Sequence, residues 1–264
     1  MERNLEIVKE ELLALVKIFH VLCTVNDIRY SIHGGTMLGA VREKGFIAWD
    51  DDIDISFTRE EYEKFEKVFN KTKSDIILRT NDMYPRLIMK RNDKPVVWMD
   101  IFIYDYIADN ILLQKCKIAL LDIMNLMFRE PSTLNFSKKN SDKNWLRYAL
   151  ILFFVKIGNS VNRSTLLAVA NLIMQSFQGN KTLIHRSNDT VKGMPIVLPE
   201  SVMNSYTMVQ FEDTELMITT SWHEILVSSY GEDYMTPKKT KMDDCHDAFI
   251  ESEVENAEKI LNLH

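Results

Sequence analysis

The pattern of hydrophobic and polar positions divides the first hundred residues into helices and short strands. Apolar residues recur every three or four positions through residues 2–25, which predicts an amphipathic helix. Polar and apolar residues alternate through residues 28–32 and 52–57, which predicts two strands, the second with one face in water. The other elements expected here are a helix capped by Thr36 and ending at Arg42, a helix at 59–70, and strands at 75–80, 86–90 and 96–103. Helices beside a small mixed sheet indicate an α+β fold.

The middle of the chain differs from both ends in charge and in hydrophobic pattern. Residues 111–163 contain nine Lys and Arg but three Asp and Glu, a local net charge of +6. Long apolar runs there predict helices with basic edges. We therefore expect a catalytic core at 1–109, a basic helical insertion at 110–187, and a C-terminal part at 188–264 that completes the core. A helix is expected at 222–229, ended by Gly231.

Composition limits the classes of protein to consider. With 264 residues and 46% apolar residues, the chain can bury a sizeable core as one large domain or as a core with an insertion. A net charge of −6 argues against nucleic-acid binding. The three cysteines match no zinc or disulfide spacing, no apolar run is long enough to span a bilayer, and the charged start does not resemble a signal peptide. These features predict a cytoplasmic protein.

An acidic segment supplies the first candidate chemistry. Asp52 and Asp54 are two residues apart on a predicted strand, so their side chains should leave the same face. Neighbouring carboxylates repel unless a cation lies between them, and hard oxygen ligands suit Mg²⁺ or Mn²⁺. Asp100, on another predicted strand, could supply a third carboxylate. An EF-hand loop is disfavoured because Ile55 stands where that loop needs glycine.

A glycine turn precedes the acidic segment. Gly34 and Gly35 allow the backbone to approach an anion closely, and a helix beginning at Thr36 would direct its free N–H groups toward a phosphate. Arg42 could donate to the same phosphate, although a surface salt bridge is an equal alternative. An ordinary turn is the commoner explanation for a lone Gly-Gly-Thr. A phosphate turn so close to paired carboxylates predicts phosphotransfer chemistry.

These segments together resemble a known family. Residues 33–42 (HGGTMLGAVR), 44–47 (KGFI) and 49–55 (WDDDIDI) are similar to the signature of the LicD family, of which fukutin-type proteins share a looser version. The resemblance continues at residues 99–102 (MDIF), 211–212 (FE) and 230–235 (YGEDYM). The chain departs from the family pattern at Ala48, where proline is common, and at Thr220-Ser221, where Val-Pro or similar is frequent.

The resemblance implies a nucleotidyltransferase fold related to polymerase β palms. It also implies transfer of a phospho-alcohol, typically phosphocholine from CDP-choline, to a sugar hydroxyl of a cell-surface glycan. In that fold Gly34 and Gly35 match the phosphate turn, and Asp52, Asp54 and Asp100 match the metal-binding acids. Choline, ethanolamine, ribitol and glycerol all remain open as the alcohol.

Three further expectations concern what the protein contacts. A choline head group favours aromatic faces, and Trp49 is the preferred candidate, with packing as the alternative role. His33 could contact phosphate or serve a structural role. The basic, aromatic segment 111–163 could lie on an anionic membrane surface that presents a lipid-linked glycan acceptor, or could simply pack on the core.

Three other functions use part of the same pattern. An ordinary nucleotidyltransferase would move NMP from NTP to a small molecule or protein, using the same turn and acids. A non-catalytic nucleotide-binding regulator would usually lack one of the three acids. A glycosyltransferase would use the Asp52-Ile53-Asp54 segment to hold a sugar nucleotide.

Overall fold

The computed structural model describes residues 5–71, 75–92, 94–131 and 145–237. The chain divides into two compact units. The first contains residues 1–79, 85–104 and 200–264, and the second contains residues 80–84 and 105–199. The long strand β5 (Lys94–Ile107) passes from the first unit into the second.

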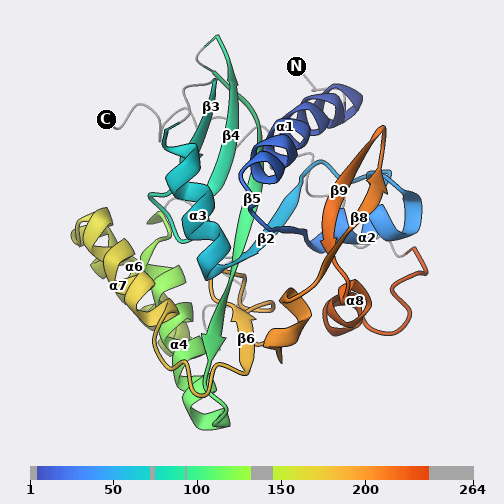
Figure 1. Cartoon of the computed structure of the whole chain (residues 1–264). Helices are drawn as coiled ribbons and strands as arrows, with labels where there is room; N and C mark the ends of the chain where they lie inside the picture. Colours follow the sequence, from blue (N-terminus) through green and yellow to red (C-terminus); the bar gives the residue numbers. More distant parts are fainter. Residues whose placement is uncertain (1–4, 72–74, 93, 132–144, 238–264) are drawn as a thin grey trace. The chain divides into compact units, whose positions relative to one another are not determined.

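The first unit is built on a mixed sheet in the order β1-β2-β5-β4-β3 (Figure 1). The parallel pair is β2 with β5, and the other neighbours run antiparallel. Its strands besides β5 are β1 (Ser31–Ile32), β2 (Asp54–Thr58), β3 (Ile76–Arg79) and β4 (Arg86–Arg91). Its helices are α1 (Leu5–Val25), α2 (Gly34–Glu43), α3 (Arg59–Phe69), α8 (Trp222–Tyr230) and the 3₁₀ helix η2 (Glu200–Met203).

Aromatic side chains join the helices of this unit to its sheet. Phe57 of β2 lies 5.9 Å from the ring of Phe19 on α1 and 5.3 Å from the ring of Phe65 on α3. All three rings are fully buried. Offset and edge-to-face rings add to the free energy gained from apolar burial, so this cluster fixes β2 between α1 and α3.

A C-terminal hairpin, β8 (Tyr206–Phe211) and β9 (Thr214–Thr219), completes the first unit. The backbone N–H of Thr219 donates to Ser31 Oγ at 3.1 Å, and that of Met217 donates to the Tyr30 hydroxyl at 3.1 Å. Segments almost 190 residues apart in the sequence are thus joined next to β1.

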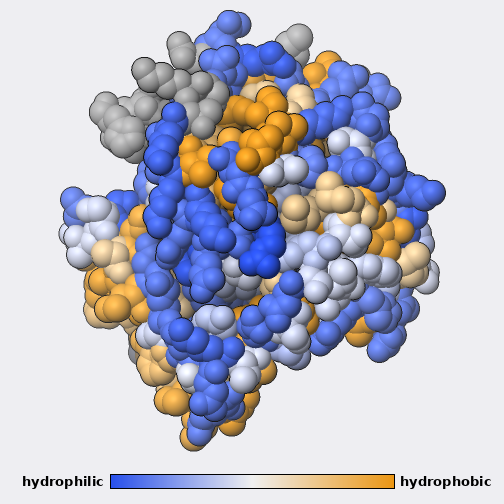
Figure 2. Space-filling view, in the orientation of Figure 1, coloured by the Kyte–Doolittle hydropathy of each residue, from blue (hydrophilic) through white to orange (hydrophobic). Residues whose placement is uncertain are grey.

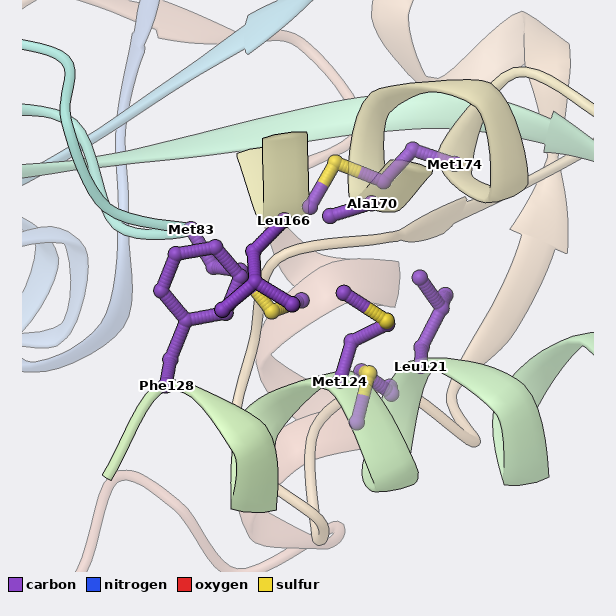
Figure 3. Packing of buried hydrophobic residues seen from close by; sticks show 8 residues of the cluster. Met83, Leu121, Met124, Phe128, Leu166, Ala170 and Met174 are labelled. Atoms are coloured by element: carbon purple, nitrogen blue, oxygen red, sulfur yellow. The ribbon is translucent and has the colours of Figure 1, made fainter. Parts of the chain in front are cut away.

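The second unit is mainly helical. It contains α4 (Ile111–Met127), α6 (Trp145–Ser160), α7 (Arg163–Met174) and the paired strands β6 (Leu183–Arg186) and β7 (Val197–Pro199). Its core is rich in methionine, whose flexible side chain fills irregular space (Figure 3). A β-carbon on Gly158 of α6 would lie 1.9 Å from the backbone oxygen of Met127, so α6 reaches the end of α4 only because this residue is glycine.

Most elements predicted from the sequence are confirmed, but several differ in their bounds, and the strand expected at 96–103 is the longer β5 (Lys94–Ile107). The strand expected at 28–32 is only Ser31–Ile32, and α2 begins at Gly34 rather than after a Thr36 cap. The strand expected to begin at Asp52 begins at Asp54, so Asp52 lies in the preceding loop. The α+β class is confirmed. The exact domain limits at 109 and 187 stay predictions, and Lys138, Lys139 and Lys143 of the basic segment lie outside the described residues.

No helix among the described residues combines the length and the apolar character needed to cross a membrane.

The second unit buries His185, and this burial favours the neutral form of the imidazole. His185 is fully buried, and its Nδ1–H donates to the Met194 carbonyl at 3.1 Å. Burial first, and then the charge of Lys117, lower the pKa of His185 to about 4. Because protonation is easier in the unfolded chain, stability should be complete above about pH 6.5 and fall as the pH drops toward 4.

We therefore expect His185 to remove about 2 kcal/mol from the free energy of unfolding between about pH 7.5 and about pH 5. Urea unfolding at both values measures this loss. In the His185→Asn variant the amide can keep the donor to Met194 without titrating, so this variant should show a flatter pH dependence. Equal pH dependence in both proteins would contradict the assignment.

Candidate active site

The glycine turn forms the first turn of α2, and acidic side chains lie against it. Gly34 has a φ of +54°, and a β-carbon there would lie 2.5 Å from Asp54 Oδ2. A β-carbon on Gly35 would lie 2.7 Å from Asp50 Oδ2. The partial positive charge of a helix N-terminus stabilises nearby carboxylates. The two glycines therefore allow Asp50 and Asp54 to approach the start of α2.

Strand pairing places two of the predicted acids side by side. Asp54 of β2 is directly opposite Asp100 of the parallel strand β5. Two further bonds fix the backbone of Asp54, whose N–H donates to Thr36 Oγ1 at 2.9 Å and whose carbonyl accepts from His33 N at 2.9 Å. The hydroxyl of Thr36 thus orients the acidic strand from inside α2 instead of capping the helix.

An arginine from the next strand binds the second acid. Arg86 of β4 is opposite Asp100 in the antiparallel register, and its Nε–H donates to Asp100 Oδ1. The guanidinium carbon of Arg86 also lies 5.6 Å from the ring centre of Trp98. This contact gives Asp100 a fixed positive neighbour, which sequence spacing did not indicate.

The loop that carries the acidic segment is held from two distant parts of the chain. Lys9 of α1 donates to the carbonyls of Ile47 at 2.8 Å and Ala48 at 3.0 Å. Burial lowers the pKa of Lys9, while the nearby Asp50 opposes that shift.

Glu212, in the turn between β8 and β9, holds the same loop from the other side. Its carboxylate accepts from Phe46 N at 2.9 Å, and its own N–H donates to the Lys44 carbonyl at 2.8 Å. A β-carbon on Gly45 would collide with this carboxylate, so the close approach requires glycine there.

The remaining predicted residues lie close by in the first unit. Arg42 is nearly buried and pairs with Glu43 at 2.7 Å, with a longer contact of 3.5 Å to the Tyr234 carbonyl. Arg42 therefore forms a salt bridge, and its contact with phosphate stays a prediction. His33 is buried, with its ring 5.1 Å from that of Phe102. Trp49 is half-buried in the turn before Asp50.

The carboxylates of Asp52, Asp54 and Asp100 are ligands that a hard cation prefers, but the structure brings only some of them together. Asp54 and Asp100 are adjacent, and Asp52 belongs to the loop that leads into β2. Among the residues that the structure describes, no three acidic, histidine or cysteine side chains form a group that could hold a metal ion. In this arrangement Asp100 Oδ1 accepts a hydrogen bond from Arg86.

Comparison with known proteins shows which family the sequence around this site resembles. Residues 27–119, which include α2, β2, Arg86 and Asp100, match the family described as LicD/FKTN/FKRP, nucleotidyltransferase domain. Over these residues, about a third of the chain, the protein is similar to the LicD family.

The proteins to which this chain is similar differ in how much of it they match. A lipopolysaccharide cholinephosphotransferase LicD of Haemophilus influenzae is 25% identical over 252 residues, which cover 84% of this chain and 88% of that protein. An uncharacterized protein of Rickettsia typhi is 29% identical, over 57% of this chain and 53% of its own length. Another from Rickettsia prowazekii is 30% identical, over 52% of this chain and 56% of its own.

The sequence analysis did not predict the roles of three residues that hold this site in place. Lys9 lies in the pattern of an ordinary amphipathic helix, and Arg86 in that of an ordinary strand. Glu212 was noticed through the family resemblance, but its contact with the 44–46 loop requires a turn formed 166 residues later. A weak indication was available for Arg86, because a charged residue on a central strand needs a partner.

The two glycines of α2 offer a matched test of this geometry. Gly34→Ala places a side chain at a left-handed φ and against Asp54, so it should lower the free energy of unfolding by about 1–2 kcal/mol. Gly35→Ala meets only the end of the Asp50 side chain and improves helix propensity, so its change should be smaller or even stabilising. Chemical denaturation of both variants measures the difference. Equal effects would contradict the described role of Gly34.

Proposed function

We propose that this protein transfers a phospho-alcohol, phosphocholine from CDP-choline in the first instance, to a sugar hydroxyl of a cell-surface glycan and releases CMP. The observation that carries this proposal is the pairing of Asp54 with Asp100, with Asp54 against the first turn of α2, in residues that match the LicD family. Similarity over most of the chain to a lipopolysaccharide cholinephosphotransferase supports the choice of alcohol and of acceptor class. A nucleotidyltransferase fold of the polymerase β type is part of the proposal.

The chemistry is a displacement at phosphorus. The acceptor hydroxyl forms a new O–P bond to the phosphorus that bears the alcohol, while the bond from that phosphorus to the bridging oxygen breaks. The leaving CMP takes the electron pair, and the hydroxyl proton passes to a base. Asp100, next to Asp54 on the sheet, is the residue proposed for the base or for a position in the ligand shell. Such transfers depend mostly on positioning and on neutralising phosphate charge.

We propose Mg²⁺ or Mn²⁺ as the cofactor, because carboxylate oxygens are the ligands that hard cations prefer. Asp54 and Asp52 would hold it, with Asp100 beside them, and when bound it would neutralise charge on the donor's diphosphate. The chain's own residues prepare that place. Thr36 and His33 fix the backbone of Asp54, and Gly34 leaves room for its carboxylate.

A nucleotidyltransferase that moves NMP from NTP is the alternative reaction, because it uses the same turn and the same acids. The two reactions differ in the phosphorus attacked, and hence in the product released, which is pyrophosphate instead of CMP.

We also include peripheral contact with an anionic membrane in the proposal, because the second unit exposes an apolar surface. On α6, Leu146, Leu150 and Phe153 recur at helical spacing and are 59%, 51% and 56% exposed. On α4, Leu112 and Leu120 are also exposed. Figure 2 shows hydrophobic side chains gathered at the surface over α4, α6 and α7. So large an apolar surface is unusual for a helix facing water.

The charge on these helices favours a lipid surface as the occupant. In the sequences of α4, α6 and α7, Asp122 is the only acidic residue, and burial raises the pKa of its carboxyl group. Lys115, Arg147 and Lys156 are exposed on α4 and α6. An apolar stripe with basic edges is typical of helices that lie in a membrane interface.

The central test measures CMP release from CDP-choline, CDP-ethanolamine, CDP-ribitol and CDP-glycerol with Mg²⁺, with and without glycan acceptor. We expect acceptor-stimulated CMP from one donor and a loss on the order of 10³-fold in Asp54→Asn or Asp52→Ala. Asp213→Asn is the matched control, since Asp213 is an exposed acid of the same unit that pairs with Lys17. Full turnover in Asp54→Asn would contradict the proposed reaction. Turnover of NTP with pyrophosphate release would favour the nucleotidyltransferase reaction instead.

Flotation with vesicles tests the membrane contact. The wild-type chain should float with vesicles that contain anionic lipid, and a Leu146→Ser, Leu150→Ser, Phe153→Ser variant should remain behind. The control replaces Ile7, Ile18 and Val21 of α1, which are similarly exposed, by serine. Equal flotation of both variants, or wild-type dimerisation through this surface without flotation, would refute membrane contact.

A further inference from the structure

Two residues with strained backbones meet beside the acidic segment. Lys44 directly follows α2 with a φ of +61°, and Glu212, the first residue of the two-residue turn between β8 and β9, has a φ of +51°. The backbone N–H of Glu212 donates to the Lys44 carbonyl at 2.8 Å. A positive φ is unfavourable for a residue with a long side chain, and such a turn usually has Gly, Asn or Asp in this place. Strain of this kind persists only where the surrounding contacts hold it.

The carboxylate of Glu212 reaches the same loop as its backbone. It accepts from Phe46 N at 2.9 Å, and the ring of the preceding Phe211 lies 4.9 Å from that of Phe46. Gly45 leaves room for this carboxylate, because any β-carbon there would collide with it. Glu212 itself is exposed, and substitutions at exposed positions change the free energy of unfolding little. The contact therefore fixes a loop more than it stabilises the fold.

The loop connects this contact to the start of α2. The Ile47 carbonyl accepts from Lys9 Nζ at 2.8 Å and from the backbone N–H of Asp50 at 3.0 Å. Asp50 in turn lies against Gly35, where a β-carbon would be 2.7 Å from its carboxylate. A displacement of the loop at Phe46 would therefore move Asp50, four residues later, relative to the first turn of α2.

We infer that Glu212 is a positioning residue for the acidic segment: its backbone N–H and its carboxylate set the conformation of residues 44–50, and the strain in its turn serves this contact. Its effect on turnover rests on the proposed function, because the acidic segment belongs to the proposed site of phosphoryl transfer. A residue that only stabilised the hairpin would behave differently when the strain is relieved.

The first measurement compares stability with loop conformation in Glu212→Asn. Asparagine adopts a positive φ with less strain but is too short to reach Phe46, so the midpoint of thermal unfolding should be unchanged or higher. Fluorine NMR of the chain labelled with fluorotryptophan reports on the loop through Trp49, whose signal is assigned with Trp49→Phe. That signal should shift or broaden in Glu212→Asn, while the signals of the other three tryptophans stay in place.

Two variants separate the role of the carboxylate from that of the turn. Glu212→Gln keeps an acceptor oxygen at the same reach, so it should preserve the Trp49 signal of the wild type. Asp213→Asn is the matched control in the same turn, because Asp213 is an exposed acid that pairs with Lys17 of α1. It should also leave the Trp49 signal in place.

A double-mutant cycle with Gly45→Ala tests the contact itself. In the wild type the added methyl group would collide with Glu212 and should displace the Trp49 signal. In Glu212→Asn the colliding carboxylate is gone, so Gly45→Ala should change the signal little further. Residues in contact give non-additive effects of this kind, whereas independent residues give additive ones.

CMP release with the donor and acceptor that support turnover extends the test to catalysis. Misplacement of the acidic segment should lower this rate about 10- to 100-fold in Glu212→Asn. The rate should stay near that of the wild type in Glu212→Gln and in Asp213→Asn.

Any of four results would overturn the inference: a Trp49 signal unchanged in Glu212→Asn, a lower unfolding midpoint with shifts in all four tryptophan signals, a Glu212→Gln variant that behaves like Glu212→Asn, or additive effects in the cycle. The spectra are independent of turnover. If they give the expected results while no CDP-alcohol yields CMP, the proposed function fails and the positioning of the loop stands. If CMP release proceeds at the wild-type rate in Glu212→Asn, the inference fails and the proposed function stands.

Discussion

The site depends on the parallel pairing of β2 with β5, which forces Asp54 and Asp100 to lie side by side. Two carboxylates this close are stable only when positive charge lies near both. The protein supplies that charge from opposite sides, with the N-terminus of α2 at Asp54 and the guanidinium of Arg86 at Asp100. Gly34 is required for the first of these contacts, because any side chain there would meet the carboxylate.

The loop before β2 shows why the first unit needs segments from both ends of the chain. Residues 44–50 form no regular secondary structure, so their backbone groups need partners from elsewhere. Lys9 supplies a donor from α1, and Glu212 supplies an acceptor from the β8–β9 turn. The hairpin is fixed in turn by its bonds to Tyr30 and Ser31. The position of the acidic segment is therefore a tertiary property.

The sequence predicted the elements whose local pattern is strong and missed the contacts that join distant strands. Hydrophobic periodicity located α1, α3 and the strands β3 to β5, because burial of one face imposes it. It placed the start of β2 two residues early, since the alternation continues through Asp52 although ladder pairing begins at Asp54. The adjacency of Asp100 to Asp54 could be expected from the family resemblance, but Arg86 could not. Its role depends on the register of β4 against β5, which no local pattern records.

The carboxylates beside the glycine turn also limit which anions this turn can bind. A helix N-terminus with free N–H groups would attract phosphate directly, but here Asp50 and Asp54 approach the first turn of α2. A phosphate added beside them would be repelled unless a cation lies between. On the neighbouring strands the charge is positive, because Arg86 of β4 is opposite Asp100 and Arg79 of β3 is opposite Arg86.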